Sequence, residues 1–141
     1  MFSGRVVVGI EGRTVKLRAW QYDIVGSSGY TVPVLLLDAD VSDNRSEDRR
    51  ITDHLYGGDD QYRLMQEIVL GVGGVRLLQA AGCTGLQTFH LNEGHAALAP
   101  LELLRAEDQT DGVTLSVQTG SRSVPAYTFH RRSSPNRTAR R

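Results

Sequence analysis

The segment Asn92-Glu93-Gly94-His95 places an amide, a carboxylate and an imidazole within four residues. Together these groups donate and accept hydrogen bonds as polyol recognition requires, and the glycine lets the backbone approach a ligand closely. A segment of this composition is as often a helix cap followed by a surface histidine as it is a binding site. Asn92, Glu93 and His95 are therefore candidate substrate-binding residues, and composition alone leaves both interpretations open.

A second segment, Tyr56-Gly57-Gly58-Asp59-Asp60, joins a glycine hinge to two carboxylates just before an apolar periodic stretch. The simpler interpretation is an N-terminal helix turn that Asp59 or Asp60 caps. The alternative is a mobile gating loop made of Tyr56, Gly57, Gly58 and Asp59. Asp59 and Glu93 would also suit the carboxylate pair of a glycosidase, but the sequence gives no distance between them, so that reading stays open.

Other motifs give no support for a metal or dinucleotide site. His90 and His95 lack an HExxH pattern, and the acidic segment 38–43 lacks the glycine and the final glutamate of a calcium loop. The glycines at 71, 73 and 74 fall inside a predicted helix rather than after a strand, which excludes the dinucleotide fingerprint. We expect no metal ligand set in this chain.

The elements that must position these segments follow from the apolar periodicity. Alternating residues predict strands over 6–10, 15–19 and 32–37, with glycine turns between them. The segment 40–50 reads as charged surface. Apolar spacings of three and four predict a largely buried helix over 60–81 that Gly82 ends, and its internal glycines indicate a close neighbouring backbone.

A short buried strand over 86–91 and a helix over 95–105, bent at Pro100, are predicted next. A helix, strand and helix after a strand-rich start are typical of an α/β domain with a parallel sheet, whose ligands lie at the carboxyl ends of the strands. That places the segment from Asn92 to His95 where a site is expected.

Composition restricts the partners. The 141 residues suit one domain, and 16 basic and 16 acidic side chains cancel, which argues against a membrane surface or a specific nucleic acid as partner. The single cysteine, Cys83, is expected to be a buried thiol, and without a signal peptide or membrane span we expect a cytoplasmic protein. Beyond Asp111 the chain lacks acidic residues and is rich in arginine, so residues 108–141 are predicted to form a disordered basic tail.

Several stretches between Arg5 and Arg105 resemble the short bacterial form of the α-glucan (glycogen, starch and maltodextrin) phosphorylases. The most specific part runs from residue 55 to residue 97. The matching stretches are Ala19-Trp20, Val32-Pro33-Val34, Leu36-Leu37-Asp38, Ile51-Thr52, Leu55-Tyr56-Gly57-Gly58-Asp59, Gln66 through Arg76, and His90 through Ala97.

The resemblance implies a retaining hexosyltransferase of two Rossmann-like domains, the B-type glycosyltransferase fold. Such an enzyme moves a terminal α-1,4-linked glucose from glucan to phosphate, releases glucose 1-phosphate and uses pyridoxal phosphate. The resemblance also implies that Asn92, Glu93 and His95 line the glucosyl pocket and that Tyr56 to Asp59 form the gate. A homodimer is possible for the full-length enzyme.

Two departures from the family pattern qualify these expectations. Family members are several times longer, so residues 1–107 would be an N-terminal-side fragment of the first domain, without the cofactor lysine. Lys16, the only lysine, does not match it, and we expect no cofactor on this chain and no activity from it alone. The resemblance is expected to end at Arg105, for which a frameshift is one hypothesis. A non-catalytic glucan-binding module and a protein that binds through its basic tail are the alternatives.

Overall fold

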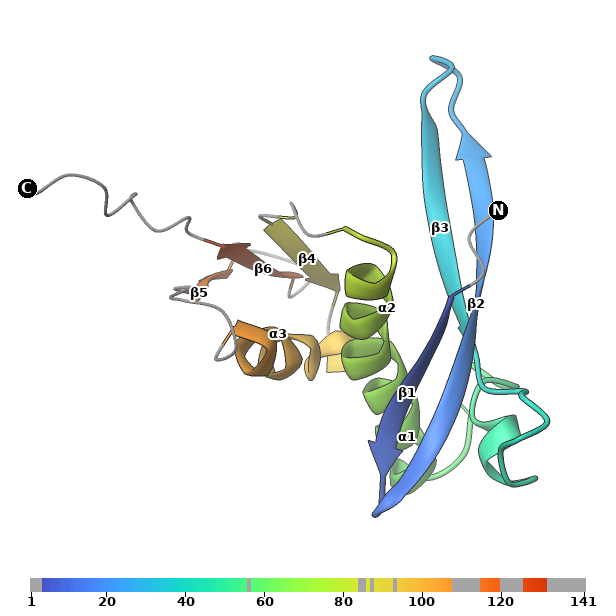
Figure 1. The fold of residues 1–141 in the computed structure, drawn as a ribbon. Coiled ribbons are helices and arrows are strands. Elements are labelled where there is room, and N and C mark those ends of the chain that lie inside the picture. Colours follow the sequence, from blue (N-terminus) through green and yellow to red (C-terminus); the bar gives the residue numbers. More distant parts are fainter. Residues whose placement is uncertain are drawn as a thin grey trace, which may run out of the picture.

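The computed structural model describes residues 4–55, 57–83, 86, 88–92, 94–107, 115–119 and 126–131. In this part of the chain, two small antiparallel sheets lie on either side of a helical layer (Figure 1). The fold is therefore mixed α/β, as expected. The parallel sheet predicted from the element order is wrong for the described strands, because every strand pair among them is antiparallel.

The first sheet is a meander of three consecutive strands, β1 (Arg5–Ile10), β2 (Arg13–Val25) and β3 (Thr31–Asp38), in the order β1-β2-β3. Alternate residues of β1 are buried and exposed, as the apolar pattern predicts. Glu11 and Gly12 both have positive φ angles, 48° and 75°, which suits a two-residue hairpin turn. Pro33 lies in β3, which pairs only with β2 among the described strands, so this proline occupies an edge strand, where a residue without an N–H is tolerated.

A helix over 60–81 is confirmed, with a wider turn inside it. It consists of α1 (Asp60–Ile68), a π-helical turn η2 (Val69–Gly73) and α2 (Gly74–Ala80). Gly82, with a φ angle of 76°, ends the helix as predicted. Its N–H donates to the Gln79 carbonyl, and the N–H of Cys83 donates to the Leu78 carbonyl. This pattern is the Schellman motif.

The main core lies between this helix and the first sheet. Most of its members are the inward residues of β1 and β2, which Val69 and Leu77 of the helix cover. The buried members of the cluster are Val6, Val8, Ile10, Val15, Leu17, Ala19, Ala39, Ile51, Val69 and Leu77.

Three burial predictions are wrong. In the helix predicted to be largely buried, Leu64 is 51% exposed, because the residues of this stretch that pack in the main core are Met65, Ile68, Val69 and Val72. Asp48 lies in the predicted surface segment 40–50, yet it is 3% exposed, because Arg13 pairs with it. Cys83 follows the helix cap and is exposed rather than buried.

The second layer begins with β4 (Thr88–Asn92), η3 (Gly94–Ala96) and α3 (Ala99–Glu107). Pro100 lies in the first turn of α3, where its missing N–H costs nothing, so it starts the helix instead of bending it. Two strands within the segment 108–141, β5 (Leu115–Thr119) and β6 (Ala126–Arg131), form a sheet with β4 in the order β4-β6-β5. Among the described residues no helix is long and apolar enough to cross a membrane.

Candidate functional site

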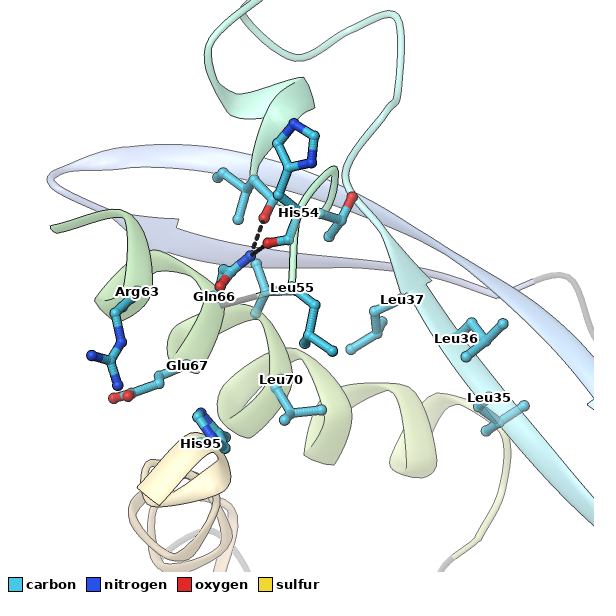
Figure 2. A pocket seen from close by; sticks show the side chains of 13 residues that line it. Leu35, Leu36, Leu37, His54, Leu55, Arg63, Gln66, Glu67, Leu70 and His95 are labelled. Atoms are coloured by element: carbon cyan, nitrogen blue, oxygen red, sulfur yellow. Dashed lines mark hydrogen bonds between the residues drawn. The ribbon is translucent and has the colours of Figure 1, made fainter. Parts of the chain in front are cut away.

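An apolar pocket opens between β3, the connection before α1 and the helical layer. Its volume is about 500 Å³. Figure 2 shows leucines on the β3 side, and a polar group where η3 meets α1. The pocket is lined by Leu35, Leu36, Leu37, Ile51, Thr52, His54, Leu55, Arg63, Gln66, Glu67, Val69, Leu70 and His95.

The connection before α1 is held to the helix by side chains, although it contains little regular structure. The Gln66 amide donates to the carbonyl oxygens of Ile51 and His54, at 2.9 and 2.7 Å (Figure 2). The Tyr62 hydroxyl donates to the Arg50 carbonyl at 2.8 Å. These bonds satisfy backbone groups that neither a helix nor a strand satisfies, so the wall of the pocket is fixed.

The polar end of the pocket consists of Arg63 and Glu67 from α1 and His95 from η3. Figure 2 shows the Arg63 guanidinium and the Glu67 carboxylate turned toward each other, with the His95 imidazole beside Glu67. A guanidinium, a carboxylate and an imidazole offer both donors and acceptors. A mainly apolar cavity with a few converging polar groups is the usual form of a small-molecule site.

His95 is positioned by a close contact between two backbones. A Cβ added to Gly71, in the π turn, would lie 2.9 Å from the backbone nitrogen of Ala99 and 3.0 Å from the Cβ of Leu98. Leu98 and Ala99 directly follow the turn that carries His95, in which Ala97 N–H bonds the Gly94 carbonyl. The expectation that another backbone packs against this glycine segment is confirmed at Gly71, whereas Gly74 has nothing within 4 Å.

The structure describes two of the three residues that the sequence grouped as one substrate site. His95 lines the pocket, and Asn92 ends β4, paired in register with Ala126. Glu93 and Tyr56 lie outside the described residues. The sequence did not single out Arg63 and Glu67, although their spacing of four residues on a helix puts them on one face.

The proposed gate has a structural role at its carboxyl end. The Asp59 carboxylate caps α1 by accepting the N–H of Tyr62 at 2.9 Å, so the cap interpretation is confirmed. Gly58 has a φ of 78°, and a Cβ there would lie 2.7 Å from Tyr62. Gly58 and Asp59 line a second hollow, of about 570 Å³, and not the pocket of His95. Asp59 and His95 therefore do not share a cavity.

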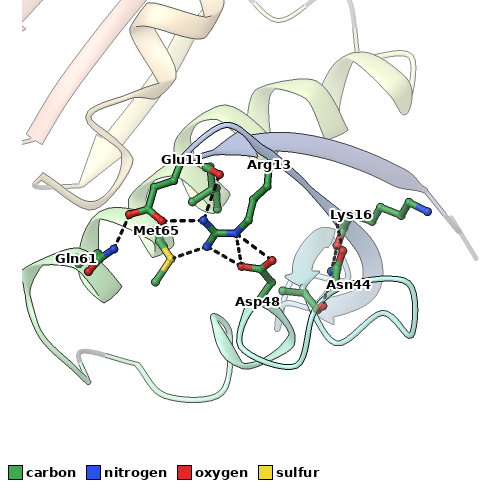
Figure 3. Close-up of polar contacts among 9 residues, drawn as sticks. Glu11, Arg13, Lys16, Asn44, Asp48, Gln61 and Met65 are labelled. Atoms are coloured by element: carbon green, nitrogen blue, oxygen red, sulfur yellow. Dashed lines mark hydrogen bonds and ion pairs between the residues drawn. The ribbon is translucent and has the colours of Figure 1, made fainter.

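A charged network closes one side of the second hollow (Figure 3). Arg13 donates to the buried Asp48 from Nε and Nη2, at 3.0 and 2.8 Å, and to Glu11 from Nη1 at 2.7 Å. Gln61 donates to the other oxygen of Glu11. Hydrogen bonds from Arg13 and Gln61 lower the pKa of Glu11, and those to Asp48 and Glu11 raise the pKa of Arg13. The network joins the first hairpin to α1.

Lys16 does not fit the lysine that binds pyridoxal phosphate. Such a lysine needs a desolvated or cationic pocket that keeps its amine neutral. Lys16 instead lies in β2 with its side chain 47% exposed, and its Nζ is 2.7 Å from the Asp43 carboxylate. Nor do the described residues contain a group of three side chains that could hold a metal ion.

Comparison with known proteins finds similarity to a short part of several phosphorylases. Glycogen phosphorylase of Mycobacterium tuberculosis (strain ATCC 25618 / H37Rv) is 40% identical over 104 residues, which are 70% of this chain and 12% of that protein. Maltodextrin phosphorylase of Thermococcus litoralis is 37% identical over 126 residues, 89% of this chain and 14% of that protein. This chain is related to a short part of the glycogen and maltodextrin phosphorylases.

Glycogen phosphorylase of Aquifex aeolicus is also similar, with 43% identity over 60 residues, 43% of this chain and 8% of that protein. The chain thus spans only a small fraction of each phosphorylase relative. The chain matches no protein-family model and no solved structure. The match to the Thermococcus relative is longer than the stretch from Met1 to Arg105, so the expectation that the resemblance ends at Arg105 is wrong.

Proposed function

We propose that this chain forms part of the glucosyl pocket of an α-glucan phosphorylase, within a Rossmann-like domain of a longer enzyme. That enzyme transfers a terminal α-1,4-linked glucose from glucan to phosphate and produces glucose 1-phosphate. The observation that carries the proposal is that His95, in the segment shared with the family, lines a preformed pocket together with Arg63 and Glu67. The named relatives support the substrate class.

Each pocket residue has a chemically suitable role in this proposal. The imidazole of His95 and the carboxylate of Glu67 bind sugar hydroxyls, and the guanidinium of Arg63 adds hydrogen-bond donors beside them. The leucines of β3 exclude water from one side of the sugar and strengthen these hydrogen bonds. We propose Asn92 and Glu93, which adjoin His95 in the sequence, as further substrate-binding residues.

The segment from Tyr56 to Asp59 is proposed as a gate that moves about its glycines. Asp59 is fixed as the cap of α1, so the movement occurs at Gly57 and Gly58, on the amino side of the helix. Side chains that replaced these glycines would press on His54 at 3.1 Å and on Tyr62 at 2.7 Å. The gate controls access to the cleft of the complete enzyme rather than to the pocket of His95 alone.

We further propose that the isolated chain neither binds pyridoxal phosphate at a specific site nor carries out phosphorolysis. The exposed Lys16–Asp43 pair supports this, because its amine contacts a carboxylate at the surface instead of lying in an enclosed pocket. Incubation with the cofactor followed by borohydride reduction should give no stoichiometric adduct on Lys16. A single-site adduct would contradict the proposal.

The pocket is tested by an NMR titration that measures the binding of maltodextrin to the 141-residue chain. His95→Ala should weaken binding about 5- to 150-fold, because a buried hydrogen bond to the sugar is worth roughly 1–3 kcal/mol. His90→Ala is the matched control, since His90 lies on β4 outside the lining of the pocket, and its effect should stay within twofold. Equal affinities of the His95 and His90 variants would contradict the assignment.

A second candidate is a non-catalytic glucan-binding module. The observation that favours it is that β3, the connection before α1 and the helical layer already form a pocket within 141 residues. Saturable binding of maltodextrin by the chain, with no gain in affinity when the rest of a phosphorylase is supplied, would favour the module over the fragment of an enzyme.

A further inference from the structure

The apolar side of β2 changes from one face of the sheet to the other along the strand. In its first half the odd positions Val15, Leu17 and Ala19 are apolar and buried against the helix. From Trp20 onward the even positions are the apolar ones, and Gln21 is polar on the opposite face. Because side chains alternate along a strand, this change means that the two halves bury different faces.

Strand β3 carries the matching half of the second apolar face. Trp20, Tyr22 and Ile24 lie directly opposite Leu36, Val34 and Val32 in the β2–β3 register. Directly opposite residues of an antiparallel pair point to the same face, so the six side chains form one surface. We name it the ribbon stripe, consisting of Trp20, Tyr22, Ile24, Val32, Val34 and Leu36.

No described element covers the ribbon stripe. The helices pack on the other face, where Leu35 and Leu37 contact the core, and Figure 1 shows β2 and β3 continuing beyond the helices as a two-stranded ribbon. Trp20 is 52% exposed and Tyr22 is 64% exposed. Large contiguous apolar surfaces of this kind mark interaction sites.

Polar groups fix the base of the stripe and give it a rim. The Trp20 indole N–H donates to Asp38 at 3.0 Å, and Arg18, which also pairs with Asp38, lies 4.9 Å from the centre of the indole ring. Tryptophan, tyrosine and arginine are the residue types in which interface hot spots are enriched. Leu36 also lines the pocket, so the apolar surface continues to Leu55 and Leu70 at the pocket.

The area of the stripe argues against a second copy of this chain as its occupant. At ~150–250 Å² for a whole aromatic side chain and ~60–120 Å² for an aliphatic one, the half-exposed members offer roughly 300–450 Å² per copy. Stable dimers bury about 800 Å² per partner. A larger partner that extends from the stripe onto the rest of the exposed ribbon, including Val25 and Tyr30, reaches that area.

We propose that the ribbon stripe docks against an apolar surface of a phosphorylase polypeptide. That surface belongs to the part of the relatives that lies outside the stretch matched by this chain. That part is the greater one, because the aligned stretch is only 12% of the Mycobacterium tuberculosis relative. The choice of partner rests on the proposed function, but the docking itself needs no sugar.

Trp20 is the only tryptophan, so the full chain labelled with 5-fluorotryptophan gives one ¹⁹F signal, from the stripe. The probe partner is the Mycobacterium tuberculosis relative without its matched 104 residues, mixed with the chain or co-expressed with it. We expect a one-to-one complex in which the ¹⁹F signal shifts and loses its dependence on H₂O or D₂O. Tyr22→Lys should weaken the complex at least tenfold, whereas Gln21→Lys, with the same charge change on the opposite face, should change it less than twofold.

Two results would overturn the docking proposal. One is that no complex forms after mixing or after co-expression, or that Trp20 stays exposed to solvent in the complex. The other is a ¹⁹F shift that depends on the concentration of the chain alone, which would assign the stripe to a second copy. Glucan binding is measured separately: docking without glucan binding would count against the proposed function only, and glucan binding with Trp20 open would count against the docking only.

Discussion

At the scale of single residues, the most consequential contact is the ion pair between Arg13 and Asp48. The Asp48 side chain is 4% exposed and accepts from two nitrogens of Arg13. It anchors the connection between β3 and α1 to the first hairpin, across 35 positions of sequence. That connection is also one wall of the pocket, so the pair supports the site without touching it.

Asp48→Ala should lower the free energy of unfolding by about 2–3 kcal/mol. Breaking a fully buried ion pair costs about 3–5 kcal/mol, and the partial exposure of Arg13 reduces that cost. Asp43→Ala, which breaks the exposed pair with Lys16, is the control and should cost less than about 1 kcal/mol. Urea unfolding followed by circular dichroism measures both, and similar losses for the two variants would contradict the role of Asp48.

At the scale of elements, the π turn inside the long helix is where two backbones meet. Gly71 has no Cβ, and the start of α3 occupies the space that a Cβ would need. Wider helical turns of this kind often occur at functional sites. Here the turn sets the distance between the helix and the segment that carries His95.

Gly71→Ala and Gly74→Ala form a matched pair of substitutions in one helix. Gly71→Ala should destabilise the chain by about 1–3 kcal/mol, because its Cβ would meet the Ala99 backbone nitrogen at 2.9 Å. Gly74→Ala should stabilise it by about 0.4–1 kcal/mol, because the site is open and helical. Thermal unfolding midpoints measure both, and a shift in the same direction for the two variants would be the contrary outcome.

Local features were predictable from the sequence, and distant pairings were not. The Asp59 cap, the helix over 60–80 and the Gly82 end depend on neighbours within a few positions, so their patterns are visible in the chain itself. The burial of Asp48 depends on Arg13, far away in the sequence. The antiparallel pairing of β4 with β6 likewise depends on contacts that no local pattern specifies. For the same reason His95 was found, whereas its neighbours Arg63 and Glu67 were missed.

At the scale of the whole molecule, Glu102 connects the helices to the first sheet. The Glu102 side chain is 5% exposed and accepts from Arg76 and Arg105, while Arg76 also donates to the Val7 carbonyl in β1. The network therefore joins the main core to the smaller cluster of Val75, Leu91, Ala99 and Leu103.

Stability should fall in acid as Glu102 takes up a proton. Hydrogen bonds from Arg105 lower the pKa of Glu102 from its ordinary value of 4.5. Burial of the carboxyl group acts in the opposite direction, and the hydrogen bond from Arg76 lowers the pKa further. A group with a lowered folded-state pKa stabilises the fold above its unfolded pKa and loses this effect as the pH falls through the folded value. The urea midpoint should therefore drop below about pH 4.5. Glu102→Gln should lower the midpoint at pH 7 and flatten this acid limb; an unchanged acid limb would contradict the assignment.

The order of β1, β2 and β3 along the chain also sets an order in time. Each strand of this sheet pairs with its neighbour in sequence, and the helix that completes its core ends at Ala80. On the ribosome, at ~5–20 residues per second, roughly 3–10 s separate the synthesis of Ala80 from that of Arg131 in β6. During those seconds the sheet and helix can fold while the second layer is still being made. An apolar ribbon with an open edge strand attracts other chains. Because the second layer does not cover the ribbon stripe, this exposure continues after the interval, until a partner covers the stripe.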